Sequence, residues 1–74
     1  MTEIIDLIQR ELELSTPIGA DTPLVSSGLV DSFAFPVLLS ALETRFGVRI
    51  GADEIGADNF DTPAQMLEFV RAKQ

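Results

Sequence analysis

Apolar residues recur at the spacing of an α-helix in three separate stretches of this chain. In the first stretch, with about 100° between successive residues, one side of a helix carries Ile4, Ile5, Ile8 and Leu12. Polar and charged residues fall on the other side, so the pattern predicts an amphipathic helix over residues 3–14. Thr2 precedes it as a candidate N-cap.

The second predicted helix begins at or just after Ser32 and ends at Phe46, where Gly47 is a stop signal. Its core face consists of Phe35, Leu38, Leu39, Leu42 and Phe46. Roughly opposite lie Phe33, Pro36, Val37, Ser40 and Thr44. A helix on the surface of a small bundle cannot bury both faces, so we expect part of the second face to be exposed.

The last predicted helix has the clearest start signal in the chain. Thr62 is its N-cap, Pro63 takes the first helical position, and Gln65 completes a capping box. Its buried stripe consists of Met66, Leu67 and Val70. Before this helix, the pattern predicts a short extended piece at residues 48–50 and one helical turn at residues 53–55.

A long connection runs from Ser15 to Asp31 and contains two prolines and two glycines. Connections of this length are uncommon in compact domains and are often functional. The residues expected to anchor it to the core are Leu24, Val25, Leu29 and Val30. The predicted fold is therefore all-α: one domain over residues 1–74, an irregular bundle of three main helices and one short helix, with a long loop between the first two helices.

Composition narrows the possible chemistry. The chain has 74 residues, no Cys and no His, and its formal net charge is −7. These features disfavour disulfides, zinc sites and imidazole catalysis, and the acidity argues against binding nucleic acid. With 46% apolar residues the chain is not typical of disorder. No apolar run reaches the length of a membrane span and no basic signal region is present, so we expect a cytoplasmic protein.

Ser32 follows the long loop at the expected start of the second helix, where it is either a simple N-cap or a group that is chemically modified. A serine nucleophile needs a neighbouring base, and the chain offers no His and a single lysine, Lys73. A self-sufficient hydrolase is therefore disfavoured, and any chemistry at Ser32 requires another protein. A phosphoester there would meet free helix amides and the positive dipole end, with the Asp31 carboxylate turned toward a cap or a modifying enzyme.

Four segments together resemble the acyl carrier proteins, over Ile4 to Val70. They are Asp31-Ser32, Leu42-Glu43-Thr44-Arg45-Phe46, Val48-Arg49-Ile50 and Asn59-Phe60-Asp61-Thr62. The resemblance implies that a phosphopantetheinyl transferase uses coenzyme A to attach a 4′-phosphopantetheine arm to Ser32, with Asp31 assisting recognition by the transferase. It implies a monomeric carrier that holds cargo as a thioester. Its partners would be a cargo-loading ligase or acyltransferase and downstream biosynthetic enzymes.

The second helix departs from the acid-rich pattern of fatty-acid carriers. Residues 33–46 contain Glu43 as their single acid, and Arg45 adds a positive charge where an acid-rich helix would be negative. We therefore expect a largely apolar partner-binding surface made of Phe33, Pro36, Val37, Ser40, Glu43 and Thr44. The alternative is that Phe33 folds back onto the loop near Leu29. The departure favours acyl or aminoacyl cargo in a specialised pathway over general fatty-acid synthesis.

Two further questions are left open by the sequence. If Ser32 caps the helix, Pro36 lies beyond the positions where a missing amide hydrogen has no cost. The sequence therefore predicts either a helix start near Phe35 or a distorted first turn. The second candidate function is a non-enzymatic helical interaction module in which Ser32 is an unmodified N-cap.

Overall fold

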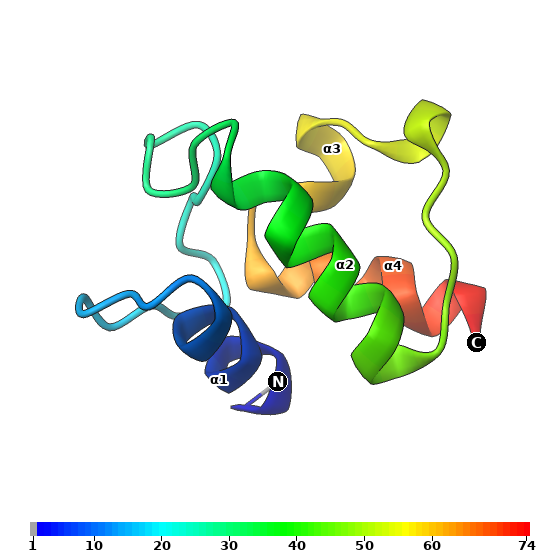
Figure 1. Cartoon of the computed structure of the whole chain (residues 1–74), viewed down its shortest axis with the longest axis horizontal. Helices are drawn as coiled ribbons and strands as arrows, with labels where there is room; N and C mark the ends of the chain where they lie inside the picture. Colours follow the sequence, from blue (N-terminus) through cyan, green and yellow to red (C-terminus); the bar gives the residue numbers. More distant parts are fainter. Residues whose placement is uncertain (1) are drawn as a thin grey trace.

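The computed structural model describes residues 2–74, and these residues form helices joined by loops, without strands (Figure 1). The elements are α1 (Thr2–Glu11), α2 (Ala34–Phe46), a 3₁₀ helix η1 (Ala52–Glu54), α3 (Ala57–Phe60) and α4 (Pro63–Lys73). The predicted all-α class, with three main helices, is confirmed. The helical turn expected at residues 53–55 is η1, displaced by one residue, and the short α3 follows it.

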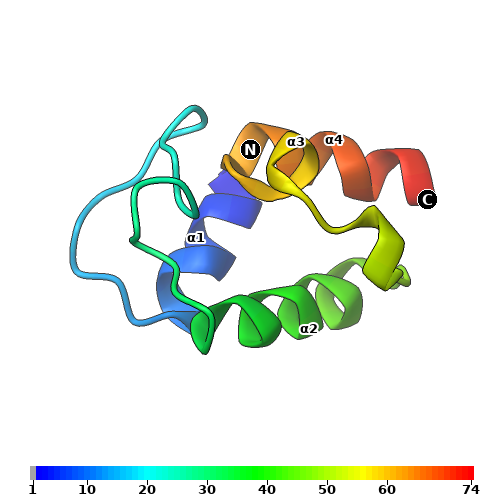
Figure 2. The ribbon, with the colours of Figure 1, turned by 90° about the horizontal axis from the view of Figure 1, so that it is seen from above.

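Seen from above, α2 lies on one side of the molecule, and α3 and α4 lie on the other (Figure 2). α1 contacts both α2 and α4, and α3 contacts α4. The hydrophobic core between them is made of Ile4, Leu7, Ile8, Leu24, Val30, Leu38, Leu42, Phe60 and Met66. The ring of Phe60 lies 6.1 Å from that of Phe35 and 4.9 Å from that of Phe69, and these aromatic contacts join α2, α3 and α4.

α1 ends earlier than the predicted residue 14. Glu13 adopts a left-handed conformation, with φ 51°. The amide of Glu13 donates to the carbonyl of Arg10, and the amide of Leu14 donates to that of Gln9. This is the hydrogen-bond pattern of a Schellman motif, which closes a helix two residues before its left-handed residue. Apolar periodicity continues past this point, because Leu12 and Leu14 still pack against the core.

The ends of α2 and α4 carry the predicted signals. Gly47 is left-handed, with φ 66°, and terminates α2. At the start of α4, the Gln65 amide donates to Thr62 Oγ1 at 3.2 Å, and the Thr62 amide donates to Gln65 Oε1 at 3.1 Å, so the capping box is confirmed. The segment at residues 48–50 is a connection outside regular structure, and it buries Val48.

The long loop is anchored by fewer apolar residues than expected. Leu24 and Val30 are buried, whereas Val25 and Leu29 are exposed, so the prediction that all four anchor the loop is wrong for two of them. The reason is a tight turn over residues 24–30, in which the Val30 amide donates to the Leu24 carbonyl at 2.9 Å. Because this bond brings the ends of the turn together at the core, the residues between them lie on its outer side.

The carboxylate of Asp61, between α3 and α4, holds this turn. Its Oδ1 accepts from the amides of Val25 and Ser26 at 3.0 and 2.9 Å, and its Oδ2 accepts from Ser26 Oγ at 2.9 Å. The Asp61 carbonyl also accepts from the Leu24 amide at 2.7 Å. The hydrogen bonds from Ser26, first from its amide and then from its hydroxyl, lower the pKa of Asp61 below its ordinary value of 3.8. Asp61 therefore joins the loop that precedes Ser32 to the opposite side of the bundle.

None of the helices described in residues 2–74 combines the length and the apolar character needed to cross a membrane.

We expect the stability conferred by Asp61 to depend on pH. Its pKa is lower in the folded than in the unfolded chain, so its contribution is present above pH 3.8 and is lost as the pH falls through the folded pKa. In urea unfolding at pH 7, Asp61→Asn should be less stable than the wild type, and this difference should shrink toward pH 3. Asp21→Asn, which removes a carboxylate from the same loop, is the matched control. A deficit of Asp61→Asn that does not change with pH would contradict the assignment.

Candidate functional site

Asp31 organises the start of α2. Its Oδ1 accepts from the amides of Phe33 and Ala34 at 3.0 and 2.8 Å, and its carbonyl accepts from the Phe35 amide at 3.0 Å. Asp31 thus acts as the helix cap, and the interpretation of Ser32 as the N-cap is wrong. The expectation that the Asp31 carboxylate turns toward a cap is confirmed.

Pro36 fits this start without breaking α2. Regular helix begins at Ala34, one residue before the predicted Phe35, and Phe33 already has helical angles, with φ −84° and ψ −39°. Pro36 lacks an amide hydrogen, so it cannot donate to the carbonyl of Ser32 four residues earlier. The bonds to the Asp31 side chain and carbonyl hold the first turn instead.

This arrangement changes the electrostatics expected for an anion on Ser32. The amides of Phe33, Ala34 and Phe35 are bonded to Asp31, and Pro36 has none. The prediction that free helix amides would receive a phosphate on Ser32 is therefore wrong, although the positive end of the helix dipole is still nearby. Ser32 is exposed, and its hydroxyl has no hydrogen-bond partner among residues 2–74. Its oxygen is therefore open to attack an incoming group.

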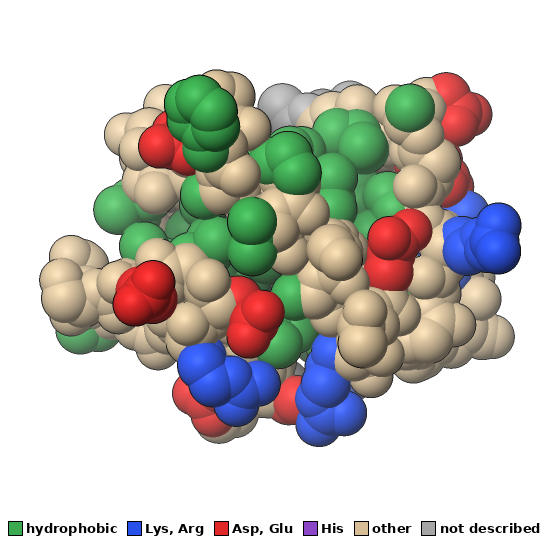
Figure 3. Space-filling model, in the orientation of Figure 1, with side chains coloured by type: hydrophobic (Ala, Val, Ile, Leu, Met, Phe, Trp, Pro, Cys, Tyr) green, Lys and Arg blue, Asp and Glu red, His purple; other side chains and the backbone are tan. Residues whose placement is uncertain are grey.

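An exposed apolar face begins directly after Ser32. Phe33 is 86% exposed and Val37 is 47% exposed, so the alternative in which Phe33 folds back onto the loop is wrong. Pro36, Ser40 and Thr44 are also exposed on α2. Figure 3 shows apolar side chains spread over this side of the molecule, with the Lys and Arg side chains toward its lower and right-hand edges and Asp and Glu side chains scattered over the view. We call Phe33, Pro36, Val37, Ser40 and Thr44 the α2 face.

Glu43 is placed differently from the α2 face. It is half-buried, and its Oε2 accepts from the Ile50 amide at 2.8 Å, so it holds the connection after α2. Arg45 points toward α1, where its Nη2 lies 2.7 Å from Glu3 Oε2. The one acidic side chain of α2 is therefore occupied within the chain, and the α2 face itself carries no carboxylate.

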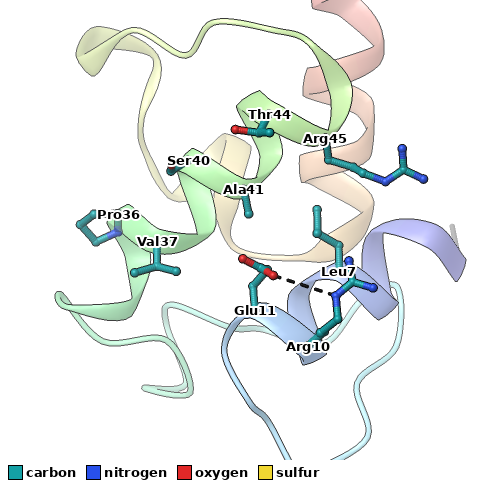
Figure 4. A pocket seen from close by; sticks show the side chains of 9 residues that line it. All are labelled: Leu7, Arg10, Glu11, Pro36, Val37, Ser40, Ala41, Thr44 and Arg45. Atoms are coloured by element: carbon teal, nitrogen blue, oxygen red, sulfur yellow. Dashed lines mark ion pairs between the residues drawn. The ribbon is translucent and has the colours of Figure 1, made fainter.

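A groove of about 610 Å³ separates α1 from α2 (Figure 4). α2 contributes Pro36, Val37, Ser40, Ala41, Thr44 and Arg45, and α1 contributes Leu7, Arg10 and Glu11. The carboxylate of Glu11 points toward α2, and Arg10 Nε lies 3.9 Å from Glu11 Oε2. The groove starts at Pro36, one helical turn after Ser32, and runs along α2 to Arg45.

The Ser32 hydroxyl has neither an imidazole nor a metal-binding cluster beside it in the described part of the chain. The chain contains no His to activate Ser32, and the described residues include no cluster of His, Cys, Asp and Glu able to bind a metal ion.

Two important side chains of the site region were missed by sequence reasoning. Asp61 accepts hydrogen bonds from Val25 and Ser26, which lie 36 and 35 positions earlier in the chain. No local sequence pattern points to such distant partners. The bond from Ile50 to Glu43 likewise requires the connection after α2 to fold back. The capping role of Asp31 had a local signal, because Asp is a preferred cap residue and Pro36 argued against a cap at Ser32.

Comparison with known proteins agrees with this picture. Residues 2–70 match the family described as "Phosphopantetheine attachment site". The chain is 29% identical over 68 residues to a D-alanyl carrier protein of Streptococcus sanguinis, covering 92% of this chain and 86% of that protein. It is 30% identical over 66 residues to a D-alanyl carrier protein of Bacillus velezensis, covering 88% and 85%. It is also 46% identical over 55 residues to the lincomycin biosynthesis protein LmbN of Streptomyces lincolnensis, covering 74% of this chain and 20% of that protein.

Proposed function

Because the chain belongs to the phosphopantetheine attachment family, we propose that Ser32 is the residue that bears its 4′-phosphopantetheine arm. Family membership makes the chain a carrier protein, which holds cargo on this covalent arm and is not itself an enzyme. The arm supplies a thiol that forms thioesters with cargo. A chain without cysteine therefore acquires its sulfur chemistry by modification.

The observation that best supports Ser32 is its placement. It is exposed, its hydroxyl is unpaired within residues 2–74, and it lies between the turn that Asp61 anchors and the first turn of α2, which Asp31 caps. Attachment would join Ser32 Oγ to the pantetheine-bearing phosphorus of coenzyme A, while the pyrophosphate bond breaks and 3′,5′-adenosine bisphosphate leaves with the bridging oxygen. The hydroxyl proton passes to a base of the transferase, since this chain has no His and its single lysine is Lys73, far along the chain from Ser32.

Asp31 has a second role in this proposal. Its Oδ1 is occupied by two amides, whereas its Oδ2 has no hydrogen bond within the described chain. Asp31 therefore presents a charged oxygen next to Ser32 while its geometry is held by the cap. We assign this oxygen to recognition by the phosphopantetheinyl transferase and its metal ion.

The cargo we propose is an acyl or aminoacyl group used in a specialised pathway. The printed names of the relatives, D-alanyl carrier proteins and a lincomycin biosynthesis protein, support such cargo. The acid-poor α2 supports it as well, because a carrier that docks on basic partners through acids would expose them there. The partners in this scheme are a cargo-loading ligase or acyltransferase and the enzymes that use the cargo. The alternative of an unmodified interaction module loses its main argument, because Ser32 is not a structural cap.

We further propose that partner enzymes dock on the α2 face, with Glu43 at its edge. Phe33 and Val37 are large apolar side chains that the fold leaves exposed beside Ser32. Apolar side chains clustered next to the attachment residue give a partner a way to bind the carrier and reach its arm together.

Incubation with coenzyme A and a broad-specificity phosphopantetheinyl transferase should add about 340 Da to the intact protein. Ser32→Ala should abolish this gain because it removes the attacking oxygen. Ser27→Ala, in the preceding turn, should leave the gain intact. A full gain of mass on Ser32→Ala, or none on the wild type, would disprove the assignment.

Docking through apolar contacts should be only weakly sensitive to salt. Affinity for the cognate loading enzyme should change little between low and moderate ionic strength, as measured by calorimetry. Val37→Glu should impair loading at least several-fold without unfolding the domain, because it places a charge in the apolar contact. Arg49→Glu, an exposed change outside the α2 face, is the control. A steep loss of wild-type affinity with salt would contradict apolar docking.

A further inference from the structure

Lys73 carries the one amine side chain in a sequence that is poor in nucleophiles. The sequence contains no Cys, no His and no Tyr, and four of its five basic residues are arginines. An arginine guanidinium stays protonated in proteins, whereas the neutral form of a lysine amine attacks carbonyl groups. A thioester is an acyl group that such an amine can take up. The single lysine therefore bears directly on how long a thioester survives on this chain.

The structure places this amine in an ion pair with a fixed carboxylate. Lys73 lies in the last turn of α4, and its Nζ is 2.6 Å from Glu54 Oε2 in η1. The other oxygen of the carboxylate, Glu54 Oε1, accepts from the Gly51 amide at 2.9 Å, which holds the side chain in place. Lys73 Nζ also lies over the ring of Phe69, 5.6 Å from its centroid. The face of an aromatic ring attracts an ammonium ion, so both contacts favour the protonated form of the amine.

This pair is less exposed than the other ion pairs described in residues 2–74. The side chains of Lys73 and Glu54 are 34% and 30% exposed, whereas those of Arg45 and Glu3 are 49% and 56% exposed. The hydrogen bond from Lys73, and after it the one from the Gly51 amide, lower the pKa of Glu54 below its ordinary value of 4.5. The carboxylate is therefore charged at neutral pH, and loss of the lysine proton would break the ion pair.

We propose that Glu54 and the ring of Phe69 hold Lys73 as an unreactive ammonium ion and so protect thioester cargo from transfer to this chain. The inference rests on the proposed attachment at Ser32, because the arm there supplies the thioester. In the reaction that is prevented, the neutral amine attacks the thioester carbonyl. A C–N bond forms, the C–S bond breaks, and the amine proton passes to the leaving sulfur. The products are an amide on Lys73 and a free thiol on the arm, so the cargo is lost.

The position of Lys73 protects it from the arm of its own chain. Gln74 Nε2 donates to the Phe46 carbonyl at 3.1 Å, so the end of α4 lies beside the end of α2, as Figures 1 and 2 also show. Ser32 precedes the opposite end of α2, whose 13 residues span about 20 Å. The arm has about fourteen bonds and extends about 17 Å at the rise of an extended peptide chain. Cargo on one copy therefore meets the lysine of another copy more readily than its own, and there the ion pair is the protection.

Acylation of Lys73 would also remove a contact between two elements of the fold. An amide carries no charge, so the acylated side chain would lose both the ion pair with Glu54 and the attraction to the Phe69 ring. The end of α4 would then no longer be joined to η1 by this pair. The same contact thus preserves the cargo and the packing of this end of the molecule.

The test measures acetyl transfer to Lys73 in the whole chain. Unmodified protein is incubated with excess acetyl-coenzyme A at mildly alkaline pH, and peptide mass spectrometry gives the rate of acetylation at Lys73. Glu54→Gln keeps an acceptor for the Gly51 amide but removes the charge, and it should raise this rate about fivefold, as expected for loss of a partly exposed ion pair. Glu68→Gln removes the same charge from an exposed position of α4 and is the matched control, which should leave the rate unchanged.

The same comparison is made on carrier loaded with an acetyl arm by a phosphopantetheinyl transferase and acetyl-coenzyme A. In concentrated solution, the thioester of Glu54→Gln should be lost faster than that of the wild type, and the acetyl group should be recovered on Lys73. Adding Lys73→Arg to Glu54→Gln should restore the wild-type lifetime, because it removes the nucleophile. If Glu54→Gln unfolds the domain, Glu54→Asp replaces it. This variant keeps the charge on a side chain shorter by one methylene, and it should raise the rate by a smaller factor.

The possible failures are distinguishable. Equal acetylation of Lys73 in the wild type and Glu54→Gln would overturn the proposed protection, and so would an equal rise in Glu54→Gln and Glu68→Gln. A thioester lifetime that stays short after Lys73→Arg is added would also overturn it, because another group would then be the acceptor. Absence of a mass gain with the transferase would overturn the attachment at Ser32, whereas the reactivity of Lys73 toward acetyl-coenzyme A is decided without the arm.

Discussion

The structure depends most on the carboxylate of Asp61, which binds a turn of the long loop from the other side of the bundle. Three hydrogen bonds reach its two oxygens from Val25 and Ser26, and a fourth reaches its carbonyl from Leu24. A loop of this length loses much conformational freedom when it is ordered, and its two buried anchors, Leu24 and Val30, are few. The bonds to Asp61 close this loop, and the closed loop sets the position of Ser32.

Signals within a few residues of each other predicted the helices of this fold. Features that depend on contacts between distant residues were not predicted. Gly47 and the capping box at Thr62 are signals read within a few residues, and both were predicted correctly. The early end of α1 was missed because Glu13 adopts a left-handed angle that glycine usually marks. The anchoring of the loop was half right, because apolar character alone does not distinguish Leu24, inside the turn, from Val25, outside it. Phe60, in the core, carried no periodic signal.

The site follows from the same constraint. Ser32 could be singled out from its position after a long loop and at the start of a helix, but the hydrogen bonds around it could not be predicted. Once Asp31 takes the three amides of the first turn, the serine is left exposed with a free hydroxyl, beside an equally exposed Phe33. The α2 face carries no charged side chain, and the acids nearest to it along the chain, Asp31 and Glu43, are held by backbone amides, so an overall charge of −7 gives little information about this surface.

The central claim is that Ser32 is a tether which other enzymes load and unload. The most direct measurement is mass spectrometry of the protein isolated from the cell that makes it, at the level of both the intact chain and the peptide that contains Ser32. The account predicts a phosphopantetheine group on that peptide, with part of the population carrying a thioester-linked acyl or aminoacyl group. A protein that is active in its own cell while Ser32 is entirely unmodified would contradict it.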